Sequence, residues 1–360
     1  MVLHHDTGRR GSSQNLTKHG IKAWLTAIPA MLIFLGAALT LFSPHSEAET
    51  GAAIPQAAKA AGYTKLTFDG EFIRNTIDLN NSTAPGFDWY LAQFFGQTAT
   101  ASHSVVTNSD GSVTLSGKDT VISINSAAPR RGAPDWVGTA FGGGGYFEAI
   151  VKFDPAKTMA NIGSQWPAFW SMAIEHLDAL PGEQWLGQAT GYSHFIEPDF
   201  FEYDVANNFV PNQYGGAIHD WYGIQKRTCR NKGYCGVTNA SGGGSSFTNF
   251  RVRVPSKTDF TKFHSFGFLW VPATSTAMGY ARYYFDGIAT SDRVTWSKYS
   301  DQPPPPGLAP WTFGIIDRQH LVIALTTGPN QPLTIKKVIV YQASAAHNLT
   351  NSNSEIVGPE

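Results

Sequence analysis

The chain has 360 residues, of which 42% are hydrophobic, 13% aromatic and 15% charged, and its formal net charge is −1. This composition excludes an intrinsically disordered chain, and the scattered lysines and arginines exclude the basic surface by which proteins bind nucleic acids. A nearly neutral surface with many aromatic rings suits neutral sugars, whose C–H faces stack on such rings, although the same rings could form the core.

A long apolar run lies near the N-terminus. Ala23 to Phe42 carries no charge, follows several basic residues and precedes the small residues Ser46 and Ala48. This order predicts an export signal over residues 1–48. Because the run is also long enough to span a bilayer, an uncleaved membrane anchor is the alternative. In both cases we expect the rest of the chain to be secreted or periplasmic.

The composition of the remaining chain predicts one all-β domain. Residues 49–62 are rich in alanine and predict a spacer; a single domain follows over 63–344, with a polar tail over 345–360. The 36 glycines and 21 prolines favour short strands joined by tight turns. Strands are predicted from alternation or short apolar runs within 112–117, 120–125, 145–154, 166–174, 195–204, 264–271, 281–287, 320–328 and 333–342.

Glycine-rich and proline-rich stretches punctuate these strands. The runs at 141–145, 241–246 and 302–307 predict loops. None has the spacing of a phosphate-binding loop. The two cysteines, Cys229 and Cys235, predict a disulfide in an oxidising compartment, with two free thiols as the alternative. A zinc site is poorly supported, because no second cysteine pair or nearby histidine pair completes four ligands.

One predicted strand, "HFIEPDFFEYD", carries several carboxylates among aromatic residues. Side chains alternate along a strand, so Glu197 and Asp199 share one face and Glu202 falls on the other. A β-bulge at Phe200 or Phe201 would bring all three acids together. The alternative is a solvated acidic face, with Glu202 paired elsewhere to a basic residue. Flanking aromatic residues favour a strand inside a sheet, where unpaired acids are costly.

Two carboxylates on one surface are what glycoside hydrolysis requires, one to attack the anomeric carbon and one to protonate the leaving oxygen. Their repulsion raises the pKa of one of them, which keeps it protonated near neutral pH. The E-x-D-x-x-E pattern of Glu197, Asp199 and Glu202 resembles the signature of glycoside hydrolase family 16. Further segments similar to landmarks of that family occur in its order at 66–72, 166–172, 263–272, 283–287 and 336–342.

The resemblance implies a jelly-roll sandwich of two curved antiparallel sheets with a concave cleft. It implies a retaining endo-β-glycan hydrolase, acting on β-1,3- or mixed-linkage β-1,3-1,4-glucan, with Glu197 as nucleophile, Glu202 as acid/base and Asp199 tuning their protonation. We expect a polysaccharide substrate, no organic cofactor and a monomer. Expected substrate contacts are Trp166, Trp170, His219, Trp221 and His264, although each aromatic or histidine residue could instead be structural.

One residue departs from the family pattern, and one family feature, a calcium site, has only a short acidic segment behind it. Pro198 stands where an aliphatic residue is usual, and its missing N–H predicts a distortion of the strand. Structural calcium occurs in the family, and the acidic residues of "FDGE" at 68–71 could contribute to such a site. A carbohydrate-binding protein without turnover and a transglycosylase are the alternatives. A polysaccharide lyase is less consistent with the acidic strand.

Overall fold

The computed structural model describes residues 53–72, 76–91, 100–117, 120–126, 136–161, 165–177, 192–204, 212–225, 237–238, 244–298 and 313–350. The chain divides into Met1–Ala52, which lies outside these residues, and Ala53–Glu360, to which every statement below refers. The expected export signal and the disulfide of Cys229 and Cys235 therefore lie outside the described residues. Among those residues, no helix is long and apolar enough to cross a lipid bilayer.

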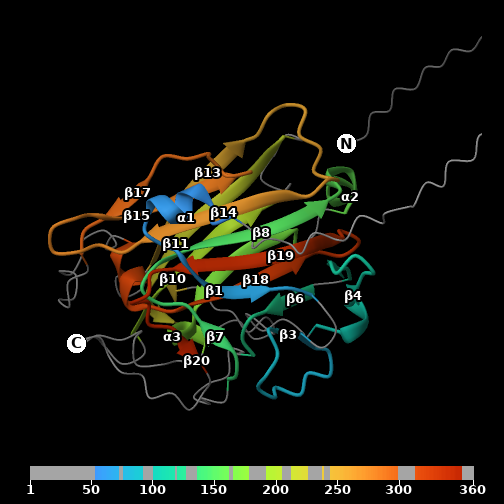
Figure 1. Ribbon diagram of the computed structural model, residues 1–360, viewed down its shortest axis with the longest axis horizontal. Helices are drawn as coiled ribbons and strands as arrows, with labels where there is room; N and C mark the ends of the chain where they lie inside the picture. Colours follow the sequence, from blue (N-terminus) through green and yellow to red (C-terminus); the bar gives the residue numbers. More distant parts are fainter. Residues whose placement is uncertain are drawn as a thin grey trace, which may run out of the picture. The chain divides into compact units, whose positions relative to one another are not determined.

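The predicted all-β jelly-roll sandwich is confirmed: two large sheets pack against each other (Figure 1). The first, here called the β8 sheet, has the strand order β16-β15-β14-β8-β19-β5-β4, with β1 added to β19 and β17 to β15. Its strands are β1 (Lys65–Gly70), β4 (Val105–Thr107), β5 (Val113–Leu115), β8 (Gly145–Phe153), β14 (His264–Val271), β15 (Gly279–Phe285), β16 (Ile288–Ala289), β17 (Val294–Trp296) and β19 (Leu333–Gln342).

The second sheet, here called the β10 sheet, has the order β12-β11-β10-β9-β18-β6-β3-β2, with β13 added to β11. The short strands β2 and β3 are parallel. Its strands are β2 (Ile77–Asp78), β3 (Trp89–Leu91), β6 (Thr120–Ser123), β9 (Ala168–Ala173), β10 (Tyr192–Glu202), β11 (Gln213–Gln225), β12 (Val237–Thr238), β13 (Gly244–Arg253) and β18 (Leu321–Thr327).

Short elements complete the described part of the domain. Two-residue strands β7 and β20 pair with each other. Three short α-helices and two 3₁₀-helices lie among the described residues. Their bounds are β7 (Thr139–Ala140), β20 (Leu349–Thr350), α1 (Gln56–Ala60), α2 (Pro155–Ala160), α3 (Ile174–Leu177), η1 (Ser102–Ser104) and η5 (Phe313–Arg318).

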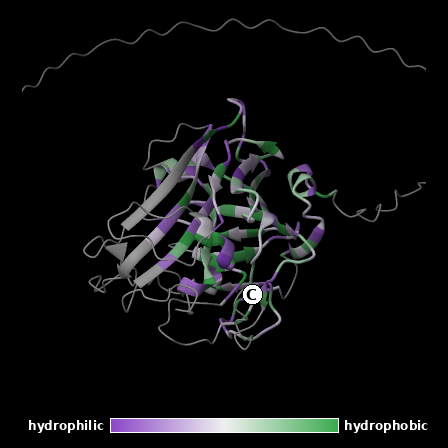
Figure 2. Ribbon diagram, turned by 90° about the vertical axis from the view of Figure 1, so that its left-hand side faces the viewer, coloured by the Kyte–Doolittle hydropathy of each residue, from purple (hydrophilic) through white to green (hydrophobic). Residues whose placement is uncertain are grey.

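The core lies between the two sheets and is largely aromatic. Phe200 of β10 stacks on Phe147 of β8 and Phe268 of β14, with ring centroids 5.5 and 4.5 Å apart. Phe169 of β9 meets Phe200 edge to face at 4.8 Å. Hydrophobic residues of both sheets gather in the strands at the centre of the domain (Figure 2). Burial of such large rings is the main source of stability for this sandwich.

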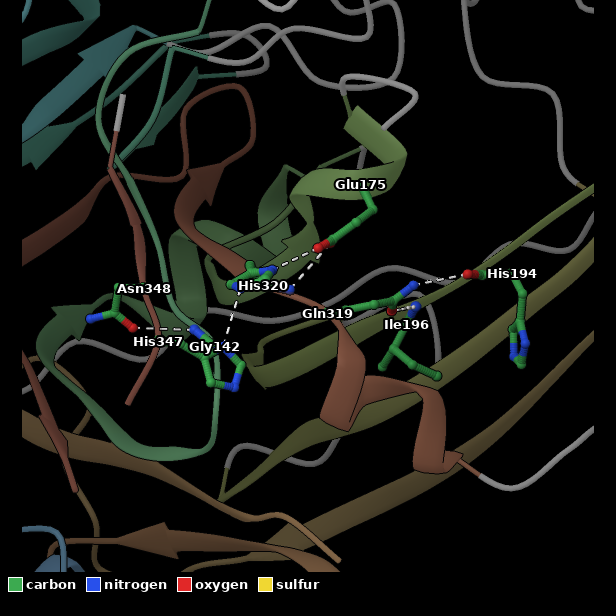
Figure 3. A network of polar contacts seen from close by, with 8 residues as sticks. All are labelled: Gly142, Glu175, His194, Ile196, Gln319, His320, His347 and Asn348. Carbon is green, nitrogen blue, oxygen red and sulfur yellow. Dashed lines mark hydrogen bonds and ion pairs between the residues drawn. The ribbon is translucent and has the colours of Figure 1, made fainter. Parts of the chain in front are cut away.

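The 3₁₀-helix η5 and the residues after it connect the two sheets. Asp317 accepts hydrogen bonds from the indole nitrogens of Trp270 and Trp296, at 2.9 and 2.8 Å. Gln319 acts on the other sheet: its Oε1 accepts from the backbone N of Ile196 at 3.1 Å, and its Nε2 donates to the carbonyl of His194 at 2.9 Å (Figure 3). Gln319 therefore takes the place of a neighbouring strand along this part of β10.

Every predicted strand segment overlaps a strand, but three regions differ from expectation. Within the expected spacer, Gln56–Ala60 forms α1, whose Ala58 is fully buried beside Tyr63 on the β8 sheet. Within the expected tail, Leu349–Thr350 forms β20. The residues after the acidic strand form the long strands β11 and β13, and β13 begins at Gly244, inside a glycine run expected to be a loop.

Candidate active site

Strand β10 contains the predicted bulge, and the extra residue is Phe200. Against β11, the pairing is regular up to Asp199 opposite Ala217, and the next pair is Glu202 opposite Gly215. Against β9, Asp199 pairs with Trp170 and Phe201 with Phe169, so β10 advances two residues while β9 advances one. One residue is thus absorbed at Phe200, as the spacing of the acids predicts.

The side chains at the bulge show how it reorients Glu202. Phe200 packs inward on Phe268, and its neighbour Phe201 also packs inward, 4.1 Å from the ring centroid of Phe266. In a regular strand these two neighbours would point to opposite faces. Because both point into the core, Glu202 returns to the outer face of the β10 sheet, which Glu197 and Asp199 share by alternation.

Pro198 does not distort the strand, contrary to expectation. The pairing of β10 with β11 runs without a shift through Pro198 opposite Ile218. The N–H and C=O of one strand residue point to the same side, and the carbonyl of Pro198 faces β9, where it accepts a hydrogen bond from Ser171 Oγ at 3.2 Å. The ladder with β9 begins only at Asp199. The missing N–H therefore interrupts no ladder hydrogen bond.

Glu197, Asp199 and Glu202 are here called the acidic group. An indole donates a hydrogen bond to each of its two glutamates. Trp221 Nε1 of β11 donates to Glu197 Oε2 at 2.8 Å. Trp166 Nε1, just before β9, donates to Glu202 Oε1 at 2.9 Å. All four side chains are half-buried, so the carboxylates remain within reach of solvent. Each carboxylate has one oxygen held by an indole, which fixes its orientation.

Asp199 lies between the two glutamates along the strand and is more deeply buried. It is 5% exposed, and its Oδ2 lies 3.1 Å from His219 Nε2. His219 sits on β11 directly opposite Glu197. The expectation for His219 was a substrate contact, whereas the structure places it against Asp199. A protonated His219 would stabilise the ionised form of Asp199.

Burial and mutual repulsion shift the acids away from their ordinary pKa values. Burial, followed by the charge of Asp199, raises the pKa of Glu197 to about 8. The same two causes raise the pKa of Glu202 to about 8. Burial also raises the pKa of Asp199 well above its ordinary range. The charge of His219 lowers the pKa of both glutamates, as does the indole bound to each. The group therefore retains protons near neutral pH.

A row of rings extends from Glu197 along the same face. Phe195, two residues before Glu197, stacks under His176 of α3 with ring centroids 3.6 Å apart and an interplanar angle of 10°. The ring centroids of Phe195 and Trp221 lie 6.3 Å apart, with an interplanar angle of 18°. His219 follows, 5.6 Å from Trp221. Sequence reasoning missed His176 and Phe195, because neither stands in a recognisable pattern.

Two of the expected contacts have other surroundings. Trp170 lies opposite Asp199 but is only 8% exposed, and its indole donates to Thr326 Oγ1 of β18, so it forms the floor of the site and not an open platform. His264 begins β14 in the other sheet; its Nδ1 lies 2.8 Å from Asp286 Oδ2 and its Nε2 3.2 Å from the carbonyl of Asp259. The structure does not bring His264 to the acidic group, and its partners are Asp286 and Asp259 instead.

The acidic residues considered for calcium have a basic partner. Lys337 Nζ lies 2.9 Å from Asp69 Oδ1 and 3.6 Å from Glu71 Oε1. Within the part of the chain that the structure describes, no group of three or more His, Cys, Asp or Glu side chains is arranged to hold a metal ion.

Comparison with known proteins gives likenesses only among solved structures. No known protein-family profile matches the chain, and no curated protein matches it. Similar structures include an endo-1,3-β-glucanase from Streptomyces sioyaensis, 14% identical, covering 79% of this chain and 96% of that one, with a TM-score of 0.44. A legume lectin-like domain from Entamoeba histolytica is 10% identical, covering 67% of this chain and 87% of that one, with a TM-score of 0.34.

The peanut lectin is also similar, at 14% identity over 69% of this chain and 90% of that one, with a TM-score of 0.28. Another is the exoplasmic/lumenal domain of VIP36 in a form bound to Ca²⁺ and mannose, at 10% identity over 82% of this chain and 99% of that one, with a TM-score of 0.33. The neighbours thus include a glucanase and carbohydrate-binding lectin-like domains, all distant in sequence and structure.

Proposed function

We propose that the chain is a retaining endo-β-glycan hydrolase of the glycoside hydrolase family 16 type, secreted or periplasmic. The observation that carries the proposal is the bulge at Phe200, which returns Glu202 to the face of Glu197 and Asp199. Nothing in the packing of β10 requires three carboxylates on that face, and their burial is costly for folding. A reaction that needs paired carboxylates accounts for their presence.

In the proposed reaction Glu197 is the nucleophile. Its carboxylate attacks the anomeric carbon while Glu202 gives its proton to the glycosidic oxygen, so that the C–O bond breaks and a glycosyl ester of Glu197 forms. Glu202 then takes a proton from water, whose oxygen attacks the same carbon and releases Glu197. The anomeric configuration is retained over the two steps.

The surroundings of the two glutamates are closely matched, so the division of roles rests on the resemblance to glycoside hydrolase family 16. Asp199 and Glu202 favour the protonated form of Glu197, and Asp199 and Asp204 favour that of Glu202. His219 and one indole favour the ionised form of each. Either group can therefore hold a proton near neutral pH, as an acid/base residue must.

The half-buried indole of Trp221, beside Glu197, supports a sugar as the ligand of this face. It can offer a stacking surface to the C–H face of a pyranose unit, whereas Phe195 is 1% exposed and lies against His176. Trp166 lies at the other acid and would contact a sugar on the opposite side of the scissile bond. We therefore propose a β-glucan chain, β-1,3- or mixed-linkage, as the substrate. A structural calcium ion at Asp69 and Glu71 stays a prediction, to be tested by calcium titration.

A release assay tests the proposal. Purified protein is incubated with laminarin, mixed-linkage glucan, agar and carrageenan, and new reducing ends are measured. Glu197→Gln should abolish release, because the amide keeps the shape of the side chain but cannot attack. Glu71→Gln, at an exposed carboxylate just after β1, is the matched control and should leave the rate unchanged. Release by Glu197→Gln at the wild-type rate would reject the assignment.

One observation favours a second candidate, a carbohydrate-binding protein without turnover. Both glutamates have a pKa raised to about 8, so at neutral pH the group has few carboxylates ready to attack. A binding protein would show saturable binding to one of these glycans by calorimetry without release of reducing ends from any. The uninterrupted pairing at Pro198 removes the main sequence argument for this candidate.

A further inference from the structure

The side chains of Glu175, His320 and His347 come together where α3, the residues after η5 and the C-terminal segment meet (Figure 3). Glu175 of α3 is 2% exposed. Its Oε1 lies 2.7 Å from His320 Nδ1, and its Oε2 accepts from the backbone N of His320 at 3.1 Å. A carboxylate beside Nδ1 holds the proton on that nitrogen, so Nε2 presents a lone pair. Glu175 therefore sets the tautomer of His320.

The lone pair of His320 faces a second histidine. His347 Nδ1 lies 3.4 Å from His320 Nε2, with the two rings nearly perpendicular at 74°. This distance is long for a hydrogen bond, which normally spans about 2.7 to 3.2 Å. Two histidine nitrogens 3.4 Å apart and each about 2.1 Å from a zinc ion subtend an angle of about 108° at the metal, close to tetrahedral. The contact lies within hydrogen-bonding range in the free protein, and the same spacing also fits a shared cation.

The glycine run that follows Phe141 leaves room for these two residues. A Cβ on Gly142 would lie 2.5 Å from His320 Cδ2 and 2.6 Å from the carbonyl oxygen of His347. A Cβ on Gly143 would lie 3.3 Å from His347 Nε2. Asn348 Oδ1 accepts from the backbone N of Gly142 at 3.2 Å and so holds the loop beside His347. Gly142 is thus explained by the two histidines, whereas a Cβ on Gly144 would meet Pro272 and Tyr63 instead.

We propose that His320 Nε2 and His347 Nδ1 together bind a divalent transition-metal ion such as zinc, with Glu175 orienting His320 and water completing the coordination. A carboxylate bound to the far nitrogen of a ligating histidine is the usual support of such a ligand. His347 binds through Nδ1 with its proton on Nε2.

The proposed ion would have a structural role. His347 lies two residues before β20, and His320 immediately precedes β18 of the β10 sheet. The carbonyl of His320 also accepts from the backbone N of Ile174, at the start of α3. A bound ion would therefore tie the C-terminal segment to the β10 sheet and to α3, and would stabilise the folded state by mass action.

Zinc binding by the full-length chain tests the proposal. Protein freed of metal with EDTA is titrated with Zn²⁺ in a calorimeter and melted with and without the ion. We expect saturable binding and a higher Tm that EDTA reverses, with no shift from Mg²⁺. His347 is exposed, so His347→Ala should fold and lose this binding, and His103→Ala, at another exposed histidine, should retain it. Glu175→Gln should weaken binding about 10- to 100-fold.

Two results would overturn the proposal. One is a wild-type chain that shows no saturable zinc binding in the millimolar range or below. The other is a His347→Ala variant that binds the same number of ions with the same affinity, since any zinc held at the acidic group of β10 or by other histidines is common to both proteins. X-ray absorption of the zinc-loaded chain gives an independent readout: two imidazole ligands are expected for the site, and their absence would contradict it.

Discussion

Replacing Glu202 by glutamine should stabilise the protein at neutral and alkaline pH. In the folded state burial and the charge of Asp199 raise the pKa of Glu202 from 4.5 to about 8. Between these two values the folded state binds more protons at this residue than the unfolded state does, so the stability contributed by neutral Glu202 is complete below pH 4.5 and is lost as the pH rises to about 8.

The shift sets the size of the effect. At about 1.4 kcal/mol per pKa unit, a rise from 4.5 to about 8 corresponds to a ceiling of about 5 kcal/mol. Glu202 is partly exposed and shares its repulsion with Glu197 and Asp199, so we expect less than half of this ceiling, about 2 kcal/mol at pH 8 or above. In a domain of this size that corresponds to a Tm higher by about 4 °C.

Thermal melts of wild type and Glu202→Gln from pH 4.5 to 9 measure the effect. We expect the two Tm values to coincide near pH 4.5, where a neutral glutamate and glutamine are nearly equivalent, and to diverge as the pH rises. Glu71→Gln, whose carboxylate is exposed, controls for the loss of any one acid. A difference independent of pH, or a less stable variant at pH 8, would refute the reasoning, because Glu202 would then be an ionised and well-partnered carboxylate.

Three further changes test other parts of the structure. Trp221→Phe removes the N–H that favours ionised Glu197, so its pKa should rise and the acidic limb of the pH–rate profile should move to higher pH; an unchanged profile would contradict the assigned hydrogen bond. Phe200→Ala empties the core side of the bulge and should cost about 3 to 5 kcal/mol in urea unfolding, whereas a loss below 1 kcal/mol would show that the ring packs poorly. Gln319→Leu leaves the backbone groups that Gln319 binds on β10 without their partner and should cost about 2 to 4 kcal/mol, with faster hydrogen exchange at the Ile196 amide; unchanged exchange there would count against this role.

The central feature of the site was predictable because it follows from a local rule. Side chains alternate along a strand, so the spacing of Glu197, Asp199 and Glu202 requires one extra residue if the acids are to meet. The structure has that residue at Phe200. The strands themselves were predictable for the same reason, since alternation and short apolar runs are local signals.

Features that depend on pairing between distant residues could not be predicted in this way. Whether Pro198 interrupts a ladder depends on where β9 begins to pair with β10, which no local pattern reports. Gln319 binds the β10 backbone from the far end of the chain. His264 lies between phenylalanines on a strand, and only the fold reveals Asp286 as its partner. The helix α1 has too few apolar residues to be recognised before its contacts on the β8 sheet are known.

Trapping of the glycosyl–enzyme intermediate is the most direct test of the central claim, which is that Glu197 and Glu202 act as a pair on one face of β10. The protein is treated with a 2-deoxy-2-fluoro-β-glucan oligosaccharide carrying a good leaving group, and its peptides are analysed by mass spectrometry. We expect one covalent sugar adduct, located on Glu197. Hydrolysis of the parent glycan with the adduct on a different residue would contradict it.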